Sequence, residues 1–424
     1  MSRKNKWGLG GEIMLLIKLA LRNLTRHKRR VLAIAIILAI GIAVYLTIDS
    51  LMLGLTQMSF NNLINLETGH LQVVNQTYWS KKEDLPLKDL IDWNSDLKAK
   101  IKKPRTIKSI MPQLKFSANL NNGVDEMPVT GYGIDIKQAR TTLSLEDYIV
   151  EGQYFTTTNY QALLGKKLAD LMELEVGDYL TLLLKTKEET FNTIDAEIVG
   201  LVNTQNPDVN NNYVYVPLNT AQNALDVEGQ ISQLLIRLNN AKNINATQAQ
   251  LKKEIMSSRQ DLTVRSWRDL AQSVIAMSKA QNIETGFMMG IILIIAAIGI
   301  INTVILSALE RTKEIGMMKA LGFKKKEIIF IFMIESAGIG FLGGIIGILL
   351  SGGGVYYLVT TGIDLSALLG GQSFGLPIMG QLYGVYAPLH FLFFFIAGVI
   401  LSILASIPPA YWAAQKDPVK AIHS

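Results

Sequence analysis

The sequence predicts a membrane protein with four transmembrane helices plus a large α+β extracytoplasmic domain inserted between the first and second helices. Three observations lead to this prediction. Only 18% of the 424 residues are charged, while 49% are hydrophobic and the mean hydropathy is +0.26; soluble domains carry about 25% charged residues. Four apolar runs are long enough to cross a bilayer. Lys and Arg are concentrated in some connections between these runs and absent from another.

A transmembrane helix requires about 20 mostly apolar residues, because the hydrocarbon core of a bilayer is about 30 Å thick. The four apolar runs satisfy this requirement at 31–55, 286–309, 328–358 and 389–414. The first run is longer than the apolar part of a signal peptide and is followed by no A-x-A site. We therefore expect an uncleaved first span.

The distribution of Lys and Arg predicts the orientation. Five of them lie between Arg22 and Arg30, six lie in 310–327, and none lies in 359–388. Because cytoplasmic connections carry the excess of basic residues, both termini are expected in the cytoplasm. The predicted order is a cytoplasmic amphipathic N-terminal segment (1–30), a first membrane helix (31–55), an extracytoplasmic domain with a helical stalk (56–285), a second membrane helix (286–309), a cytoplasmic segment (310–327), a third membrane helix (328–358), an extracytoplasmic loop (359–388), a fourth membrane helix (389–414) and a cytoplasmic tail (415–424).

The segment 56–285 has the mixed composition of a soluble domain. Short runs rich in Val, Ile, Leu and Tyr and bounded by Gly, Asn or Asp predict strands: His70–Val74, Tyr179–Leu184, Ala196–Val202 and Asn212–Val216. Apolar residues at helical spacing predict helices at Gln161–Met172 and Ala246–Met256, and a largely helical stretch over Ala241–Ile283. This mixture indicates an α+β domain.

No catalytic, cofactor-binding or metal site is expected in this chain. It has no Cys and 4 His, and neither H-E-x-x-H nor G-x-S-x-G occurs. A P-loop is also missing, because Gly165-Lys166-Lys167 lacks the upstream Gly and the following Ser or Thr. If ATP and Mg are used, we expect another chain to bind them. The net charge of +6 comes largely from basic residues beside the apolar runs, which indicates topology rather than nucleic-acid binding.

Polar and small residues stand out in and beside the third span. Glu335 lies within it, where a carboxylate is costly unless it is paired or near an interface. A functional proton or substrate site and a structural pair near the cytoplasmic third are both open, and the structural pair is favoured. Small residues spaced for close helix packing, within the subunit or across a dimer, are Gly340, Gly343, Gly344 and Gly347.

The most informative stretch is the charged segment SALERTKEIGMMKALGFKKKEI at 307–328. Ile315, Met318 and Leu321 recur at helical spacing, opposite Lys313 and Glu314, and Gly316 and Gly322 permit a break and a turn. The segment resembles the cytoplasmic signature of the MacB/FtsX/LolC-LolE family of ABC transporter permeases, E-R-x-x-E-I-G-x-x-x-A-x-G. Segments that resemble other parts of the family are Ala20–Leu24, Leu164–Ala169, Val176–Asp178, Val199–Gly200, Val214–Leu218, Pro409–Ala410 and Asp417–Ile422.

This resemblance implies a mechanotransmission permease. Two permease subunits, identical or related, would pair in the membrane lipids above a dimer of cytoplasmic ABC ATPase subunits, and ATP-driven closure would move the outer domains. The segment 56–285 would then be a MacB-like periplasmic core domain, and 310–327 would be the segment that couples to the ATPase. The expected coupling residues are Glu310, Arg311, Glu314, Ile315, Gly316, Met318, Lys319, Ala320 and Gly322.

The branch of the family is suggested by a short motif. Thr68-Gly69-His70-Leu71-Gln72-Val73 looks like the lipoprotein-releasing LolC/LolE branch, which implies a bacterial inner-membrane protein that passes lipoproteins toward the outer membrane, with a lipoprotein or a periplasmic carrier as partner. About thirty residues precede the first span, and no ATPase is expected on the same chain. The alternatives are an unfused MacB-like exporter of peptides or antibiotics, or an FtsX-like regulator of a cell-wall hydrolase.

Overall fold

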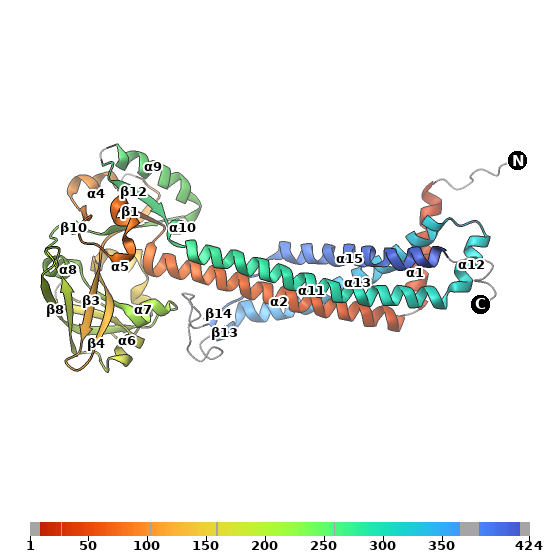
Figure 1. Ribbon diagram of the computed structural model, residues 1–424, viewed down its shortest axis with the longest axis horizontal. Helices are drawn as coiled ribbons and strands as arrows, with labels where there is room; N and C mark the ends of the chain where they lie inside the picture. The colour runs from red at the N-terminus through yellow and green to blue at the C-terminus, as the bar shows by residue number, and fades with distance from the viewer. Residues whose placement is uncertain are drawn as a thin grey trace. The chain divides into compact units, whose positions relative to one another are not determined.

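The structure is a computed structural model that describes residues 9–26, 28–101, 104–157, 160–257, 259–364 and 381–415 (Figure 1). Its contacts divide the chain into two compact units. The helical unit comprises 1–55, 279–363 and 382–424, and the large domain comprises 56–278 and 364–381. The predicted tail residues from 416 onward lie outside the described residues.

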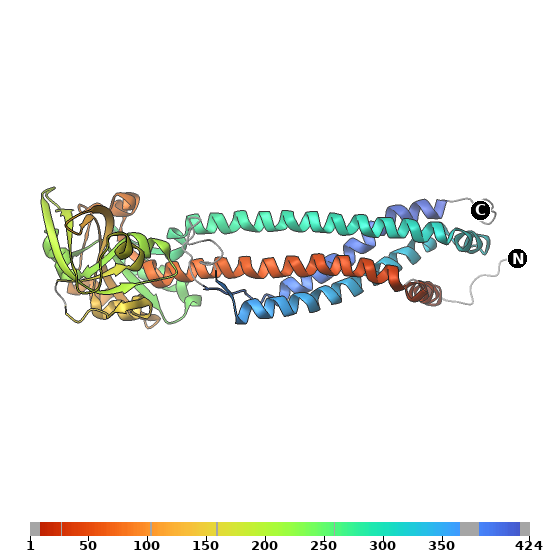
Figure 2. The ribbon, with the colours of Figure 1, turned by 90° about the horizontal axis from the view of Figure 1, so that it is seen from below.

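The helical unit is built from six helices among the described residues. They are α1 (Leu9–Arg26), α2 (Lys28–Leu63), α11 (Gln272–Glu310), α12 (Thr312–Ala320), α13 (Lys325–Thr360) and α15 (Pro388–Gln415). The helices α2, α11, α13 and α15 are long and apolar enough to cross a membrane, and each contains one of the four predicted apolar runs. Figure 2 shows these four helices running alongside one another.

The helices of this unit pack through an apolar core. Ile34 of α2, Ile300 of α11, Ile328 of α13 and Ala410 of α15 are buried in the same cluster. The N-terminal helix α1 joins them by burying Leu16 and Ala20 against Ile331 of α13. Met14 on the same helix is 73% exposed.

The large domain is an α+β fold around a ten-stranded sheet. In the described residues the order is β12-β1-β11-β3-β4-β9-β6-β8-β5, with β7 pairing β3 and β8. The strands are β1 (Leu71–Asn75), β3 (Ile107–Asn121), β4 (Glu126–Ile134), β5 (Ile149–Gly152), β6 (Gln161–Gly165), β7 (Tyr179–Lys185), β8 (Phe191–Val202), β9 (Tyr213–Pro217), β11 (Gln233–Leu238) and β12 (Leu262–Ser266). Two short pairs are β2 (Ile91–Asp92) with β10 (Gln230–Ile231), and β13 (Ile363–Asp364) with β14 (Gln381–Leu382).

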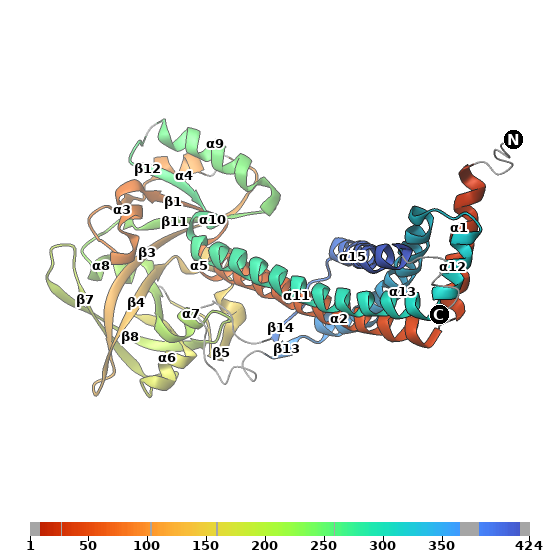
Figure 3. The same ribbon diagram turned by 45° about the vertical axis from the view of Figure 1, so that its right-hand side comes forward.

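Short helices cover this sheet. They are α3 (Gln76–Ser80), α4 (Ser95–Ile101), α5 (Ile136–Thr142), α6 (Lys166–Leu171), α7 (Pro207–Asn212), α8 (Leu218–Ala224), α9 (Ile244–Met256) and α10 (Trp267–Leu270). Figure 3 shows α4 and α9 beside β1 and β12. These two helices bury Ile101 and Leu251 against Val73 and Val264 of the two strands, so this end of the sheet has its own apolar core.

Two predicted helical stretches of this domain are wrong in part. Residues 161–165 of the predicted helix Gln161–Met172 form β6, and only 166–171 form α6. The apolar residues of this strand are buried between β8 and β9, a pairing that local spacing does not show. Similarly, the stretch Ala241–Ile283 is interrupted by β12, which pairs with β1 through its whole length.

His70 links two strands of the sheet at the T-G-H-L-Q-V motif. Gly69 has φ +61°, which favours glycine and turns the chain into β1. The backbone N–H of Leu238 then donates a hydrogen bond to Nδ1 of His70 at 3.2 Å, at a register shift in β11. Burial lowers the pKa of His70 to about 4, and the positive charge of Arg237 adds to this effect. The folded protein therefore holds a neutral imidazole.

This neutral imidazole predicts a loss of stability in acid. The unfolded chain protonates His70 below about pH 6.5, whereas the folded chain does so only near pH 4. The free energy of unfolding therefore decreases as the pH falls through this window, by about 3 kcal/mol from this residue. His70→Asn keeps an acceptor for Leu238 and removes the titration. Thermal unfolding of both proteins between neutral and acidic pH should show a smaller decrease in the variant, and equal decreases would contradict the assignment.

Candidate functional site

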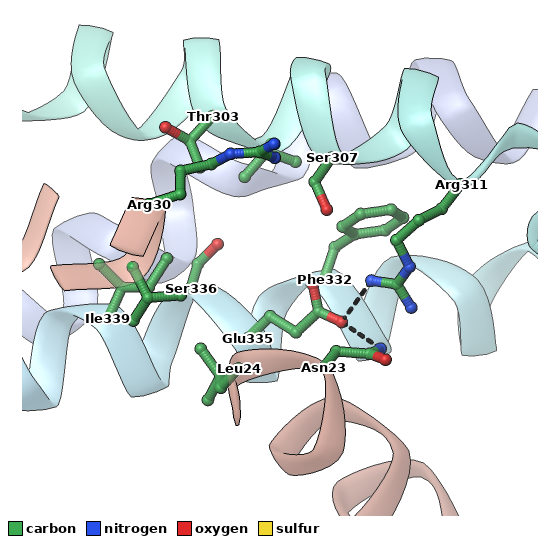
Figure 4. A pocket seen from close by; sticks show the side chains of 12 residues that line it. Asn23, Leu24, Arg30, Thr303, Ser307, Arg311, Phe332, Glu335, Ser336 and Ile339 are labelled. Atoms are coloured by element: carbon green, nitrogen blue, oxygen red, sulfur yellow. Dashed lines mark hydrogen bonds and ion pairs between the residues drawn. The ribbon is translucent and has the colours of Figure 1, made fainter. Parts of the chain in front are cut away.

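A cluster of polar and charged side chains joins α1, α12 and α13 to the connection between α11 and α12. Arg311, between α11 and α12, donates from Nη1 to Oε1 of Glu335 on α13 and from Nε to Oε2 of Glu314 on α12, both at 2.9 Å. Asn23 of α1 donates from Nδ2 to the same Oε1 of Glu335 at 2.5 Å. Figure 4 shows Asn23 and Arg311 converging on this carboxylate. We call Asn23, Arg311, Glu314 and Glu335 the polar cluster.

The polar cluster is largely shielded from solvent. The side chains of Arg311 and Glu335 are 10% and 12% exposed. Burying two such charges is costly unless they are paired and further hydrogen-bonded, and here the carboxylate receives a guanidinium and an amide. The carboxylate that stood out in the third apolar run is therefore paired with a cation from the 307–328 signature segment.

Two further ion pairs lie beside the polar cluster and are more exposed to solvent than the Arg311–Glu335 pair. Arg26 of α1 contacts Glu314 at 2.9 Å, and Arg30 of α2 contacts Glu310 of α11 at 2.5 Å. Burial alone would raise the pKa of Glu314, but hydrogen bonds and charges from Arg311 and Arg26 hold this pKa below its usual value. Exposed ion pairs contribute little singly. Their role here is geometric, because together they join α1, α2, α11 and α12.

A small cavity of about 30 Å³ adjoins the polar cluster, lined in part by Thr303, Ser307 and Ser336. Such a volume accommodates about one water molecule and no larger ligand. Among the described residues, no group of three or more His, Asp and Glu side chains is placed to hold a metal ion. The interactions observed at this site are ion pairs and hydrogen bonds between helices.

The helix α12 presents one buried and one exposed face. Ile315 and Gly316 are buried and Met318 is partly buried, whereas Met317 and Leu321 are 54% and 81% exposed. Of the predicted apolar face, Ile315 and Met318 pack against the helical unit, whereas Leu321 is exposed. Lys319 is half-buried, and Ala320 and Gly322 are exposed.

Gly322 ends α12 in a defined turn. It has φ +97°, its N–H donates to the carbonyl of Lys319, and the N–H of Phe323 donates to that of Met318, both at 3.0 Å. This pair of bonds is the Schellman motif, which favours glycine at this position. Phe323 and Met318 also pack against the same apolar clusters. The turn thus directs the chain from α12 into α13.

The four glycines of α13 pack against two different helices. A side chain at Gly343 or Gly347 would meet the backbone carbonyl oxygens of Ala35 or Ala39 on α2, at 2.9 and 3.0 Å from an added Cβ. At Gly340 and Gly344 it would meet Ser402 and Phe395 of α15, at 2.5 and 2.7 Å. The four glycines therefore lie at close contacts between α13 and the helices α2 and α15 of the same chain.

The exposed residues Met317 and Leu321 were missed as candidates from the sequence. The family pattern skips both positions, and the periodicity places Leu321 on the same apolar face as Ile315 and Met318. The exposure of Leu321 could have been predicted from Gly322. A glycine at this position favours the end of a helix, so no further helical turn follows to cover the leucine.

Comparisons with known proteins match both units. A family model for the MacB-like periplasmic core domain matches 31–254, and one for the FtsX-like permease C-terminal region matches 286–418. Macrolide export ATP-binding/permease protein MacB 2 of Yersinia pestis bv. Antiqua is 24% identical over 425 residues, which is 96% of this chain and 57% of that protein. An uncharacterized ABC transporter permease of Methanocaldococcus jannaschii is 24% identical over 345 residues, 79% of this chain and 82% of that protein.

A solved structure, the periplasmic region of MacB from Actinobacillus actinomycetemcomitans, covers 50% of this chain and 95% of its own at 15% identity and a TM-score of 0.37. The chain spans 35% of MacB of Brucella abortus and 57% of that of Yersinia pestis.

Four apolar helices with an α+β domain define a multi-pass membrane protein. With both family models matched, the chain belongs to the MacB/FtsX-like family of ABC transporter permeases.

Proposed function

We propose that this chain is a non-catalytic permease subunit of a mechanotransmission transporter, driven by ATP and Mg bound to a separate ATPase dimer. In this proposal the termini and α12 lie in the cytoplasm, and the large domain, inserted between the first two membrane helices, lies in the periplasm. The supporting observation is the polar cluster. Through the ion pair between Arg311 and Glu335, it connects the segment that resembles the family signature to the long apolar helix α13.

The exposed face of α12 is the proposed ATPase contact. Met317, Ala320 and Leu321 would touch the partner, while Ile315 and Gly316 hold α12 against the bundle. A displacement of α12 would reach α13 through Arg311–Glu335 and α1 through Glu314–Arg26. It would also reach α11, which is unbroken over 39 residues and is therefore about 58 Å long. In this proposal, a displacement at one end of the continuous helix α11 is transmitted to its other end.

This contact predicts the effect of Leu321→Asp. The leucine side chain is 81% exposed, so its replacement should leave the thermal midpoint of the chain unchanged. An aspartate in an apolar contact loses solvation without a partner, and co-purification of the ATPase should fall at least tenfold. Leu171→Asp, at a leucine 55% exposed on α6 of the large domain, is the control and should retain the ATPase. Equal retention by both variants would remove α12 from the interface.

We propose that the transporter releases lipoproteins from the inner membrane toward the outer membrane. This proposal rests on the resemblance of residues 68–73 to the LolC/LolE branch. A second permease, identical or related, and a lipoprotein or carrier are the proposed partners. Export of peptides or antibiotics is the alternative, and the similarity to macrolide export proteins over 96% of this chain favours it. Regulation of a wall hydrolase is a further alternative, supported by the FtsX-like match.

Affinity purification of the tagged chain in nanodiscs, followed by mass spectrometry, separates these functions. An ATPase together with acylated lipoproteins supports release. An ATPase with an adaptor and no lipoprotein supports export, and one with a wall hydrolase supports regulation. Purification without any ATPase overturns the proposed mechanism.

A further inference from the structure

A second polar site lies within the large domain. It is a cavity of about 450 Å³, inside the range typical of small-molecule pockets. Its floor is one face of five adjacent strands, β1, β11, β3, β4 and β9. Covered sheet faces are normally apolar, but the floor side chains here are Gln72, Gln233, Lys115, Thr130, Tyr132 and Tyr213.

The strand register brings these polar residues together. Lys115 of β3 lies directly opposite Tyr132 of β4, and Thr130 of β4 lies opposite Tyr213 of β9. Because side chains two apart in a strand share a face, Thr130 and Tyr132 both line the cavity. The polar floor is therefore formed by several side chains that the strand register places on one face of the sheet.

Lys115 is a half-buried cation that lines the cavity and forms no ion pair among the described residues. Its Nζ instead lies 5.0 Å from the ring centroid of Tyr132. Burial lowers the pKa of Lys115, and the opposite charge of Glu67 acts against this effect. An ammonium group removed from water is costly unless an anion compensates it. An anionic group of a ligand would supply that compensation.

Two carboxylates, Glu67 and Asp208, also line the cavity, and the positive charge of Lys115 compensates Glu67 only in part, because burial still raises the pKa of Glu67. Asn206 donates a hydrogen bond to Glu67, but no described cation forms an ion pair with either carboxylate. Burial raises the pKa of Asp208. A positively charged group of a ligand would relieve the repulsion between these two acids.

The floor also contains an unused hydrogen-bond acceptor. Gln72 is 1% exposed, and its Oε1 has no partner among the described residues. Buried polar atoms are rarely left unpaired, because the lost hydrogen bond to water is not replaced. An N–H group inside the cavity would satisfy this oxygen.

We propose that this cavity binds a small zwitterion of the free amino acid or short peptide class. The ligand carboxylate would lie at Lys115, its ammonium group at Glu67 and Asp208, and a ligand N–H at Gln72. A short peptide brings both charges and an amide N–H in one molecule, and a free amino acid brings both charges and the N–H groups of its ammonium. This proposal is independent of the cargo and of the ATPase contact.

The test uses the full chain in detergent and trialanine with free termini as the probe. Isothermal titration should show saturable binding at millimolar concentration or below, and N-acetylated, C-amidated trialanine should bind at least tenfold more weakly. Lys115→Met should also weaken binding at least tenfold. Lys108→Met is the matched control, because Lys108 is exposed on the same strand, and its affinity should equal that of the unmodified chain.

A second variant, Gln72→Leu, tests the same binding site if Lys115→Met does not fold. It removes the unpartnered acceptor, so the thermal midpoint without probe should stay equal or rise while the affinity falls. Three results overturn the proposal: no binding of trialanine or of any free amino acid, equal binding of the blocked peptide, or unchanged affinity in folded Lys115→Met and Gln72→Leu.

Discussion

Arg311→Met is expected to lower the free energy of unfolding of the chain by about 3–5 kcal/mol. The substitution removes the guanidinium that pairs with Glu335 and leaves a carboxylate that is 12% exposed with only the amide of Asn23 as a donor. An uncompensated buried charge is more destabilising than the loss of the pair itself. Thermal or denaturant unfolding of the purified chain in the same detergent measures the effect.

The double variant Arg311→Met/Glu335→Met distinguishes a charge effect from a packing effect. It removes both charges, so at least half of the lost stability should return. Arg26→Met is the control, because Arg26 pairs with Glu314 while remaining 66% exposed, and its cost should stay below about 1 kcal/mol. A double variant as unstable as the sum of the two single variants would show that Arg311 and Glu335 act independently.

The same variants test the proposed transmission. In reconstituted membranes, Arg311→Met/Glu335→Met should bind the ATPase, because the exposed face of α12 is unchanged. It should nevertheless transmit less movement to α13, so that ATP hydrolysis continues while substrate release decreases. Full release at the normal rate of hydrolysis would exclude this pair from transmission.

The four long helices could be predicted from the sequence because their signal is local. A run of apolar residues long enough to cross a bilayer satisfies its backbone hydrogen bonds within itself. The strand β7 and the helix α9 were also predictable from short patterns. Residues 161–165 were not, because A-L-L-G suits a helix as well as a buried strand, and only the pairing with β8 and β9 decides between them.

The candidate site was predictable residue by residue but not as a cluster. Glu335 stood out as a carboxylate in an apolar run, and Arg311 as part of the family signature. They lie 24 residues apart, and Asn23 lies 312 residues from Glu335. Their convergence depends on the rotation of α1 and α13 about their axes, which no local pattern contains. The polar floor of the large domain was missed for a related reason, since its residues come from five strands.

Gly343→Leu is expected to disrupt the packing of α13 against α2. An added Cβ lies 2.9 Å from the carbonyl oxygen of Ala35 and 3.0 Å from Leu38. A backbone oxygen cannot rotate away as a side chain does, so α13 must separate from α2. Overpacking of this kind costs about 1–3 kcal/mol, and we expect the upper end for a leucine. The thermal midpoint in detergent should therefore fall.

Gly353→Leu on the same helix is the matched control. An added Cβ there has no atom within 4 Å, so the same chemical change meets open space. Replacing a glycine within a helix also stabilises it by about 0.8–1 kcal/mol, and the midpoint should stay equal or rise. Equal losses at both positions would mean that leucine disturbs α13 generally. A loss at Gly343 alone supports close contact with α2 as the reason why the sequence holds a glycine there.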